Sequence, residues 1–126
     1  MNGASTAQAV PSASRRVLIV EDEVLIAMVL EDMLDMLGHA VVGTPSTYAE
    51  AEAAIVAGGF DLAILDVNLG NEPVFPLADQ LQAVGTAFVF ATGSHRDSLP
   101  GRFAATPVIE KPYAAAAVET ALAQLA

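Results

Sequence analysis

The chain has 126 residues, 54% of them hydrophobic, which is enough for one domain with a sizeable core but not for a second catalytic or DNA-binding domain. Its formal net charge of −10, with 5 Lys and Arg, argues against nucleic-acid binding, because contacts to phosphate need clustered basic residues. There is no Cys for disulfide or thiolate chemistry and no apolar stretch long enough to cross a membrane, so we expect a cytoplasmic protein with protein partners.

The opening segment, residues 1–14, is rich in Ala, Ser, Gly and Thr, and we expect it to be a disordered tail. From residue 15 to residue 126, extended apolar runs alternate with helical patterns about five times. This alternation is typical of an α/β domain in which helices cover a parallel sheet.

The first strand is predicted at residues 17–20, and a helix follows at residues 24–37. The helix stops at Gly38, a residue that readily adopts the conformation needed just after a helix. Its predicted apolar stripe consists of Ile26, Val29, Leu30, Met33 and Leu37.

The second strand is predicted at residues 40–43 and the third at residues 62–65. Between them, Thr47 and Glu50 form a capping box that opens a helix. The Gly pair that begins at Gly58 ends this helix.

Beyond Asp66, Gly and Pro residues delay the next helix to residues 77–83, which leaves a long loop. A fourth strand is predicted at residues 88–91 and a short fifth strand at residues 108–109. The segment between them has little helical periodicity, so we expect the fourth covering helix to be short, irregular or absent. The last helix is predicted at residues 114–125.

Polar side chains follow four of these strands. The first strand ends in Glu21 and Asp22, the third in Asp66 and the fourth in Thr92, and the fifth leads into Lys111. Because neighbouring parallel strands end at the same edge of a sheet, we expect these groups to share one crevice. Carboxylates suit a hard divalent cation, and an ammonium group can pair with a phosphoryl group.

Each of these residues also has an ordinary structural explanation. Asp66 alone could be a turn or cap residue, and Thr92 is common in strands. Lys111 could be a surface charge, although it is the only lysine in the chain. The combination favours the functional interpretation, because acids at the end of the first strand would repel a phosphoryl group unless a cation were bound with them.

The site resembles that of the receiver domain of two-component response regulators, over the chain from Arg16 to the C-terminus. The resemblance rests on Glu21-Asp22, Asp66, Thr92 and Lys111-Pro112, in that order and at similar spacing. It implies a flavodoxin-like, (βα)5 doubly wound parallel sheet with strand order 2-1-3-4-5. The receiver domain would span residues 15–126.

The resemblance also implies a role for each site residue. Asp66 would be the phosphoacceptor, and Thr92 and Lys111 would contact the phosphoryl group. The implied ligands of Mg²⁺ or Mn²⁺ are Glu21, Asp22, Asp66 and the backbone carbonyl of Asn68.

Two features set this chain apart from most receivers. Val108 stands three residues before the lysine, where receivers usually carry a Tyr or Phe that acts as a rotating switch. The run Phe90-Ala91-Thr92-Gly93-Ser94 resembles the motif of the "FAT GUY" subgroup, and Tyr113 also fits that subgroup. The resemblance implies a reduced fourth helix, which members of this subgroup tend to have, and an association with general stress signalling.

The resemblance implies a single-domain response regulator that takes a phosphoryl group from a sensor histidine kinase or a phosphotransfer protein. A downstream protein would bind the face of the fourth and fifth helices, with no nucleic-acid or membrane partner. The chain would not be an enzyme in the usual sense, beyond slow autodephosphorylation. A phosphate sink and a constitutive, non-phosphorylated scaffold remain alternatives.

Two enzyme-like alternatives are less favoured. Haloacid dehalogenase-like phosphatases carry a second acid two residues after the nucleophile, and Asn68 occupies that position here. A flavodoxin-like FMN binder is disfavoured because the acidic loop after the first strand cannot cradle a phosphate.

Overall fold

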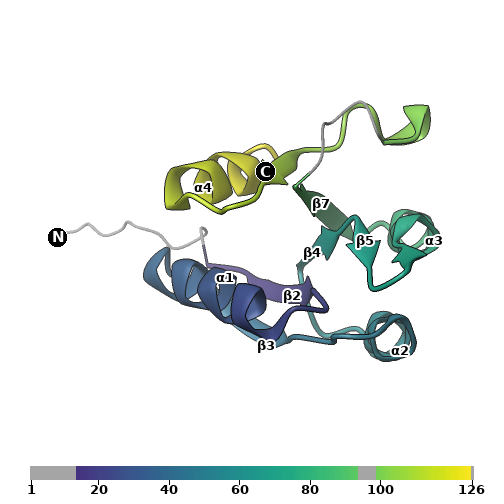
Figure 1. Ribbon diagram of the computed structural model, residues 1–126. Helices are drawn as coiled ribbons and strands as arrows, with labels where there is room; N and C mark the ends of the chain where they lie inside the picture. The colour runs from purple at the N-terminus through teal and green to yellow at the C-terminus, as the bar shows by residue number, and fades with distance from the viewer. Residues whose placement is uncertain (1–13, 94–98, 126) are drawn as a thin grey trace, which may run out of the picture.

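The computed structural model describes residues 14–93 and 99–125, which form a five-stranded parallel sheet with helices on both faces (Figure 1). The strands are β2 (Arg16–Val20), β3 (Ala40–Gly43), β4 (Leu62–Asp66), β7 (Ala87–Thr92) and β8 (Val108–Glu110). They lie in the order β3-β2-β4-β7-β8, which confirms the predicted order 2-1-3-4-5. The predicted tail, apart from Ser14, lies outside the described residues.

The four α-helices of the described residues divide between the two faces of the sheet. Their bounds are α1 (Val24–Met36), α2 (Tyr48–Ala57), α3 (Phe75–Ala83) and α4 (Ala115–Ala123). Strand residues alternate between the faces: Ile19 packs in the core beside α1 and α4, whereas Leu18 packs in the core beside α2 and α3. Both faces of the central strands are therefore buried, which explains their continuous apolar runs. No helix among the described residues is both long enough and apolar enough to cross a membrane.

Local chemistry sets the ends of α1 and α2. Gly38, just after α1, has a φ of +90°, which favours glycine. The Thr47 hydroxyl accepts the backbone N–H of Glu50 at 3.1 Å, as predicted. The Glu50 carboxylate, however, accepts the backbone N–H of Ser46 at 3.0 Å instead of that of Thr47, so the capping box forms only in part.

The predicted buried stripe of α1 is partly wrong. The fully buried residues are Ala27, Leu30 and Leu34, whereas Val29 is 48% exposed. A stripe centred on Leu30 takes in the residues about one turn away on either side, and Val29 lies about 100° around the helix from Leu30. Part of the apolar surface of α1 therefore faces outward.

The predicted loop after Asp66 contains a small antiparallel hairpin of β5 (Asn68–Leu69) and β6 (Glu72–Pro73). The following helix, α3, begins at Phe75, two residues earlier than predicted. Pro76 lies in its first turn, where a residue without a backbone N–H is tolerated. The last helix, α4, is shorter at both ends than its predicted range of residues 114–125.

The fourth covering helix is reduced, as predicted. In the described part of the connection between β7 and β8, the helical segment is a single 3-10 turn, η3 (Gly101–Phe103). Phe103 is fully buried, and its ring centroid lies 5.2 Å from that of Phe90. Arg102 pairs with Asp79 of α3 at 3.0 Å, so the turn is fixed to the neighbouring helix.

Candidate functional site

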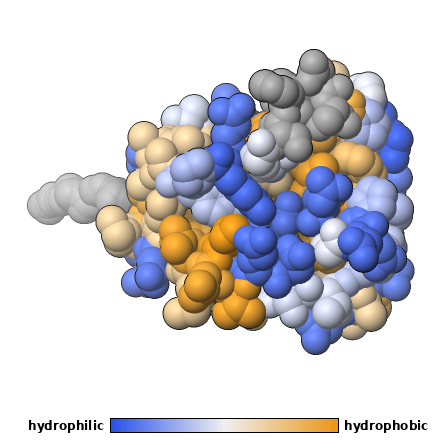
Figure 2. All heavy atoms as spheres, viewed as in Figure 1, coloured by the Kyte–Doolittle hydropathy of each residue, from blue (hydrophilic) through white to orange (hydrophobic). Residues whose placement is uncertain are grey.

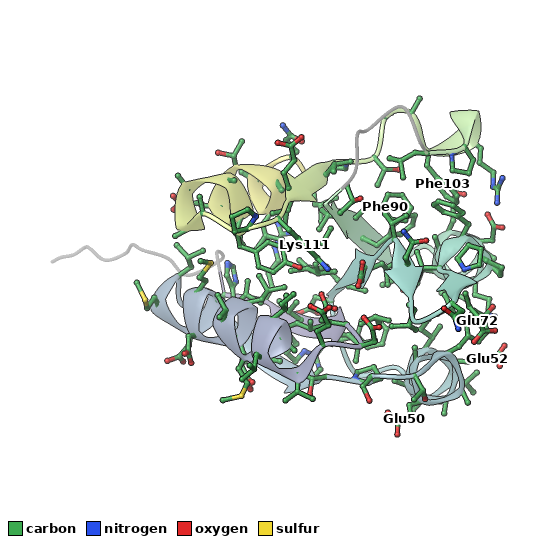
Figure 3. The ribbon with its side chains drawn as sticks, viewed as in Figure 1. Glu50, Glu52, Glu72, Phe90, Phe103 and Lys111 are labelled. Carbon is green, nitrogen blue, oxygen red and sulfur yellow. The ribbon has the colours of Figure 1, made fainter. Side chains whose placement is uncertain are left out.

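The predicted site residues converge at the edge of the sheet where the parallel strands end. Asp66 is the last residue of β4 and Thr92 the last residue of β7. Glu21 follows β2 directly, and Lys111 follows β8. Figure 3 shows Lys111 reaching from the end of β8 across this edge. The backbone N–H of Lys111 donates to the carbonyl of Thr92 at 3.0 Å, which ties the two strand ends together.

Lys111 bridges two buried carboxylates. Its Nζ lies 3.0 Å from Glu21 Oε1 and 3.2 Å from Asp66 Oδ2. Burial acts to lower the pKa of Lys111, but hydrogen bonds and charge from the two acids outweigh it and raise the pKa. The other Glu21 oxygen, Oε2, accepts the backbone N–H of Glu23 at 3.1 Å.

Asp66 is in an environment that disfavours its ionised form. Burial, followed by the hydrogen bond and negative charge of Glu21, raises its pKa to about 7, although Lys111 acts in the opposite direction. The ionised form of this carboxyl group is therefore less favoured here than in water. One ammonium group does not compensate fully for the acids around it.

Backbone N–H groups orient two of the carboxylates. Gly70, in the turn of the β5–β6 hairpin, donates to Asp22 Oδ2 at 3.0 Å. The backbone N–H of Asn68 donates to Asp66 Oδ1 at 3.3 Å. The hairpin therefore contacts the site at two points. No local pattern indicated the contact to Asp22, because the two partners are 48 residues apart.

The donor set fits a divalent cation. Glu21, Asp22 and Asp66 each offer a carboxylate oxygen, and the three oxygens lie within 4.8 Å of one another. With Lys111, the cluster carries a net charge of −2 when every group is ionised. A hard cation with oxygen ligands would neutralise this excess, and Mg²⁺ and Mn²⁺ both suit such ligands. The carbonyl of Asn68 remains a predicted fourth ligand.

Val108 occupies the position three residues before the lysine. It is half-buried and packs against the core on the side of α2 and α3, next to Phe90 in the sheet register. Thr92 is buried at the end of the neighbouring strand. Because valine has no ring, an aromatic rotation beside Thr92 is impossible at this position.

Tyr113 is a site residue whose role the sequence did not reveal. Its hydroxyl lies 3.4 Å from Glu21 Oε1, although the two residues are 92 positions apart. Burial and the negative charges of Glu21 and Asp66 raise the pKa of Tyr113. The sequence signals were its position two residues after Lys111 and its fit to the "FAT GUY" subgroup.

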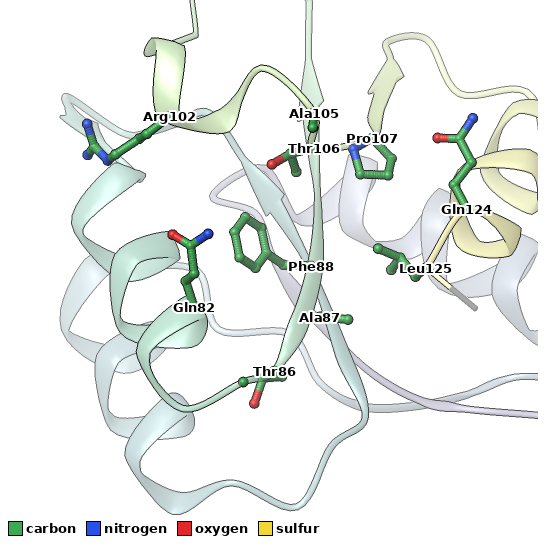
Figure 4. A pocket seen from close by; sticks show the side chains of 11 residues that line it. Gln82, Thr86, Ala87, Phe88, Arg102, Ala105, Thr106, Pro107, Gln124 and Leu125 are labelled. Carbon is green, nitrogen blue, oxygen red and sulfur yellow. The ribbon is translucent and has the colours of Figure 1, made fainter.

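A cavity lies away from this site, at the end of the sheet where β7 begins (Figure 4). Its volume is about 660 Å³, and its lining includes Gln82, Phe88, Arg102 and Gln124. None of the predicted site residues lines it. The acid cluster with Lys111 is therefore the candidate site.

Comparison with known proteins connects this geometry to a family. The family model described as the response regulator receiver domain matches residues 17–123. The phyllosphere-induced regulator PhyR of Methylorubrum extorquens is 33% identical over 112 residues, which cover 86% of this chain and 42% of that protein. The chain thus spans less than half the length of this relative.

Solved structures are similar over nearly the whole chain. SdrG from Sphingomonas melonis Fr1 is 51% identical, with a TM-score of 0.81 over 91% of this chain and 98% of that chain. The REC domain of the response regulator PhyR from Erythrobacter litoralis is 31% identical, with a TM-score of 0.77 over 90% of this chain and 91% of that chain.

Proposed function

The chain belongs to the response regulator receiver domain family, and we propose that it acts as a signalling switch by accepting a phosphoryl group on Asp66. The observation that carries this proposal is the ion pair between Lys111 and Asp66 beside two further acids. A nucleophilic carboxylate, a cluster suited to a divalent cation and an ammonium group are the components that phosphoryl transfer to aspartate requires.

In the proposed transfer, a carboxylate oxygen of Asp66 attacks the phosphorus of a phosphohistidine on a partner protein. A P–O bond forms, the P–N bond breaks, and the imidazole leaves with the electron pair. A divalent cation held by Glu21, Asp22 and Asp66 would offset the negative charge that opposes this approach.

Lys111 and Thr92 would then bind the new phosphoryl group. In the unphosphorylated chain the ammonium of Lys111 is shared between Glu21 and Asp66. The phosphoryl oxygens of phosphorylated Asp66 would be stronger charged acceptors and would draw Lys111 toward them, together with the hydroxyl of Thr92. Hydrolysis of the acyl phosphate by water would reset the switch.

The phosphodonor protein is proposed to bind an apolar patch on α1. Four large apolar residues are exposed there: Val24, Leu25, Met28 and Val29. Figure 2 shows this patch in orange over α1 beside hydrophilic residues. A groove of about 350 Å³, lined by Val29, Lys111 and Tyr113 among others, connects the patch to the lysine. An apolar surface next to the acceptor suits a partner that must bring its phosphohistidine to Asp66.

The downstream protein is proposed to bind the face formed by α4 and β8. Two open grooves, of about 320 and 390 Å³, run along this face, and Val108 lines both. Because Lys111 follows β8 directly, its movement toward the phosphoryl group would change this strand and the surface beside it.

Similarity to PhyR and SdrG supports a role in general stress signalling. PhyR is a stress response regulator and an anti-anti-sigma factor, and SdrG has a BeF3-activated conformation. BeF3 resembles a phosphoryl group in shape and charge, which supports phosphorylation as the activating event in this chain as well.

The proposal is tested by intact mass after incubation with acetyl phosphate, with and without Mg²⁺. We expect a single Mg²⁺-dependent phosphoryl adduct on the wild type and no adduct on Asp66→Asn. A wild type that forms no adduct would favour a constitutive scaffold. An adduct that persists on Asp66→Asn would assign the acceptor to another residue.

A further inference from the structure

Tyr113 reaches the candidate site from just before α4. Its half-buried side chain packs against the core on the side of α1 and α4. Its hydroxyl lies 3.4 Å from Glu21 Oε1, and the same oxygen accepts Lys111 Nζ at 3.0 Å. We propose that Tyr113 is a positioning residue that holds Glu21 in the crevice after Lys111 moves away from it. This inference rests on the proposed metal-dependent phosphoryl transfer.

Glu21 needs a partner on each oxygen because it is almost completely buried, with 2% of its surface exposed. A buried carboxylate that loses its hydrogen bonds becomes strongly unfavourable, and it escapes by turning toward water or by taking up a proton. The backbone of Glu23 supplies one donor to Oε2. Within the described part of the chain, Lys111 and Tyr113 contact Oε1.

Lys111 is a donor that the reaction would remove. A divalent cation beside the three acids repels the ammonium group, and a phosphoryl group on Asp66 attracts it away from Glu21. The Tyr113 hydroxyl is uncharged, so a neighbouring cation does not expel it. Of these two contacts to Oε1, the one from Tyr113 can therefore remain when a metal ion is held.

The length of the contact between Tyr113 and Glu21 indicates in which state the hydroxyl supports the carboxylate. Hydrogen bonds from a hydroxyl to a carboxylate are usually about 2.5–2.7 Å long, so the present contact of 3.4 Å is weak. While Lys111 occupies Oε1, the loss of the Tyr113 hydroxyl costs little. Once Lys111 has left, the hydroxyl can move closer and becomes the main support of that oxygen. Removal of the hydroxyl should therefore weaken metal binding more than it weakens the metal-free fold.

The test separates the hydroxyl from the ring. Tyr113→Phe keeps the ring packed against α1, whereas the hydrogen bond to Glu21 is lost. Calorimetric titration with Mg²⁺ should show affinity about fivefold to tenfold weaker than in the wild type, the size expected for the loss of one ordinary hydrogen bond. The matched control is Tyr48→Phe in α2, which should bind Mg²⁺ like the wild type.

A spectroscopic measurement on the same control makes the test independent of activity. The chain contains 2 Tyr and no Trp, so Tyr48→Phe leaves Tyr113 as the only tyrosine. Its emission should change on Mg²⁺ addition, with the same midpoint as the calorimetric titration, because its hydrogen bond to Glu21 shortens. An emission that does not change with Mg²⁺ would contradict a hydrogen bond that shortens.

Two outcomes would overturn the inference. Equal Mg²⁺ affinity of Tyr113→Phe and the wild type, in protein that still forms the Asp66 adduct, would reject the role of the hydroxyl and leave the proposed function intact. A wild type that binds no Mg²⁺ and forms no adduct would reject the proposed function, and the role of Tyr113 with it.

Discussion

Lys111 Nζ lies 3.2 Å from Asp66 Oδ2, so the only lysine of the chain contacts the candidate acceptor in the unphosphorylated protein. The same ammonium group lies 3.0 Å from Glu21 Oε1. It therefore joins the ends of β2, β4 and β8 through one side chain. The ammonium group has two opposing effects. It offsets the repulsion between the acids, and it also neutralises negative charge that a bound cation would otherwise neutralise.

Lys111→Met should destabilise the metal-free protein. Without the ammonium, the buried pair Glu21 and Asp66 has no compensating charge, so we expect the free energy of unfolding at pH 8 to fall by about 3 kcal/mol. Urea unfolding measures this change. Arg102→Met is the control, because it breaks an exposed ion pair with Asp79 and should cost about 1 kcal/mol or less. Equal losses in both variants would mean that the bridge contributes no more than a surface pair.

The stability of the metal-free protein should fall as pH rises. Asp66 has a folded-state pKa of about 7, above its ordinary value of 3.8, so the folded state binds more protons than the unfolded state between these values. The favourable contribution is complete below the ordinary pKa and is lost as pH rises through about 7, with a span of no more than about 4 kcal/mol.

Urea unfolding in a chelator at several pH values between 4 and 8 checks this expectation. Asp66→Asn should flatten the profile and should be more stable than the wild type at the upper end, because it removes a buried charge. An unchanged pH profile in the variant would show that another group causes the dependence.

Mg²⁺ should stabilise the wild type by an amount that grows with the logarithm of its concentration. Asp22→Asn should reduce this effect strongly, because a carboxylate charge is lost from the cluster. The Asn amide oxygen can still accept the N–H of Gly70, so the hairpin contact is kept. Thermal unfolding with and without Mg²⁺ measures the difference. Asp79→Asn, outside the acid cluster, should respond to Mg²⁺ like the wild type.

Leu25→Asp should slow phosphorylation by a protein donor and leave phosphorylation by acetyl phosphate unchanged. Leu25 is 76% exposed in the apolar patch of α1, so the charge should impair docking without disturbing the core. Val56 is 79% exposed on α2, and Val56→Asp provides the matched control. The rates of adduct formation with a phosphorylated histidine kinase and with acetyl phosphate give the comparison. Similar slowing in both variants would place the docking surface elsewhere.

Phe103→Ala should lower the free energy of unfolding by about 3–5 kcal/mol. The ring is fully buried and lies 5.2 Å from Phe90 and 5.8 Å from Phe75, so its removal leaves a cavity under η3. Urea unfolding measures the loss. A change below 1 kcal/mol would mean that the turn rearranges to fill the space.

Most elements could be predicted because their signals are local. Apolar runs located the five sheet strands, and Gly38 and Gly58 marked the ends of two helices. The errors arose where local signals compete with packing. The stripe of α1 included Val29 because its apolar residues extend around more than one face, and contact with the sheet selected the face centred on Leu30.

The sequence by itself determined which chemical groups stand at the strand ends, because strand boundaries and residue types are properties of short segments. It placed acids after β2, Asp66 at the end of β4 and Lys111 after β8, and parallel strands bring such ends to one edge. Only the tertiary structure decided which atoms touch. The bridge from Lys111 to Glu21 and the contact of Tyr113 with the same oxygen depend on how β8 and α4 pack beside β2 and α1, and packing joins residues that no local pattern relates.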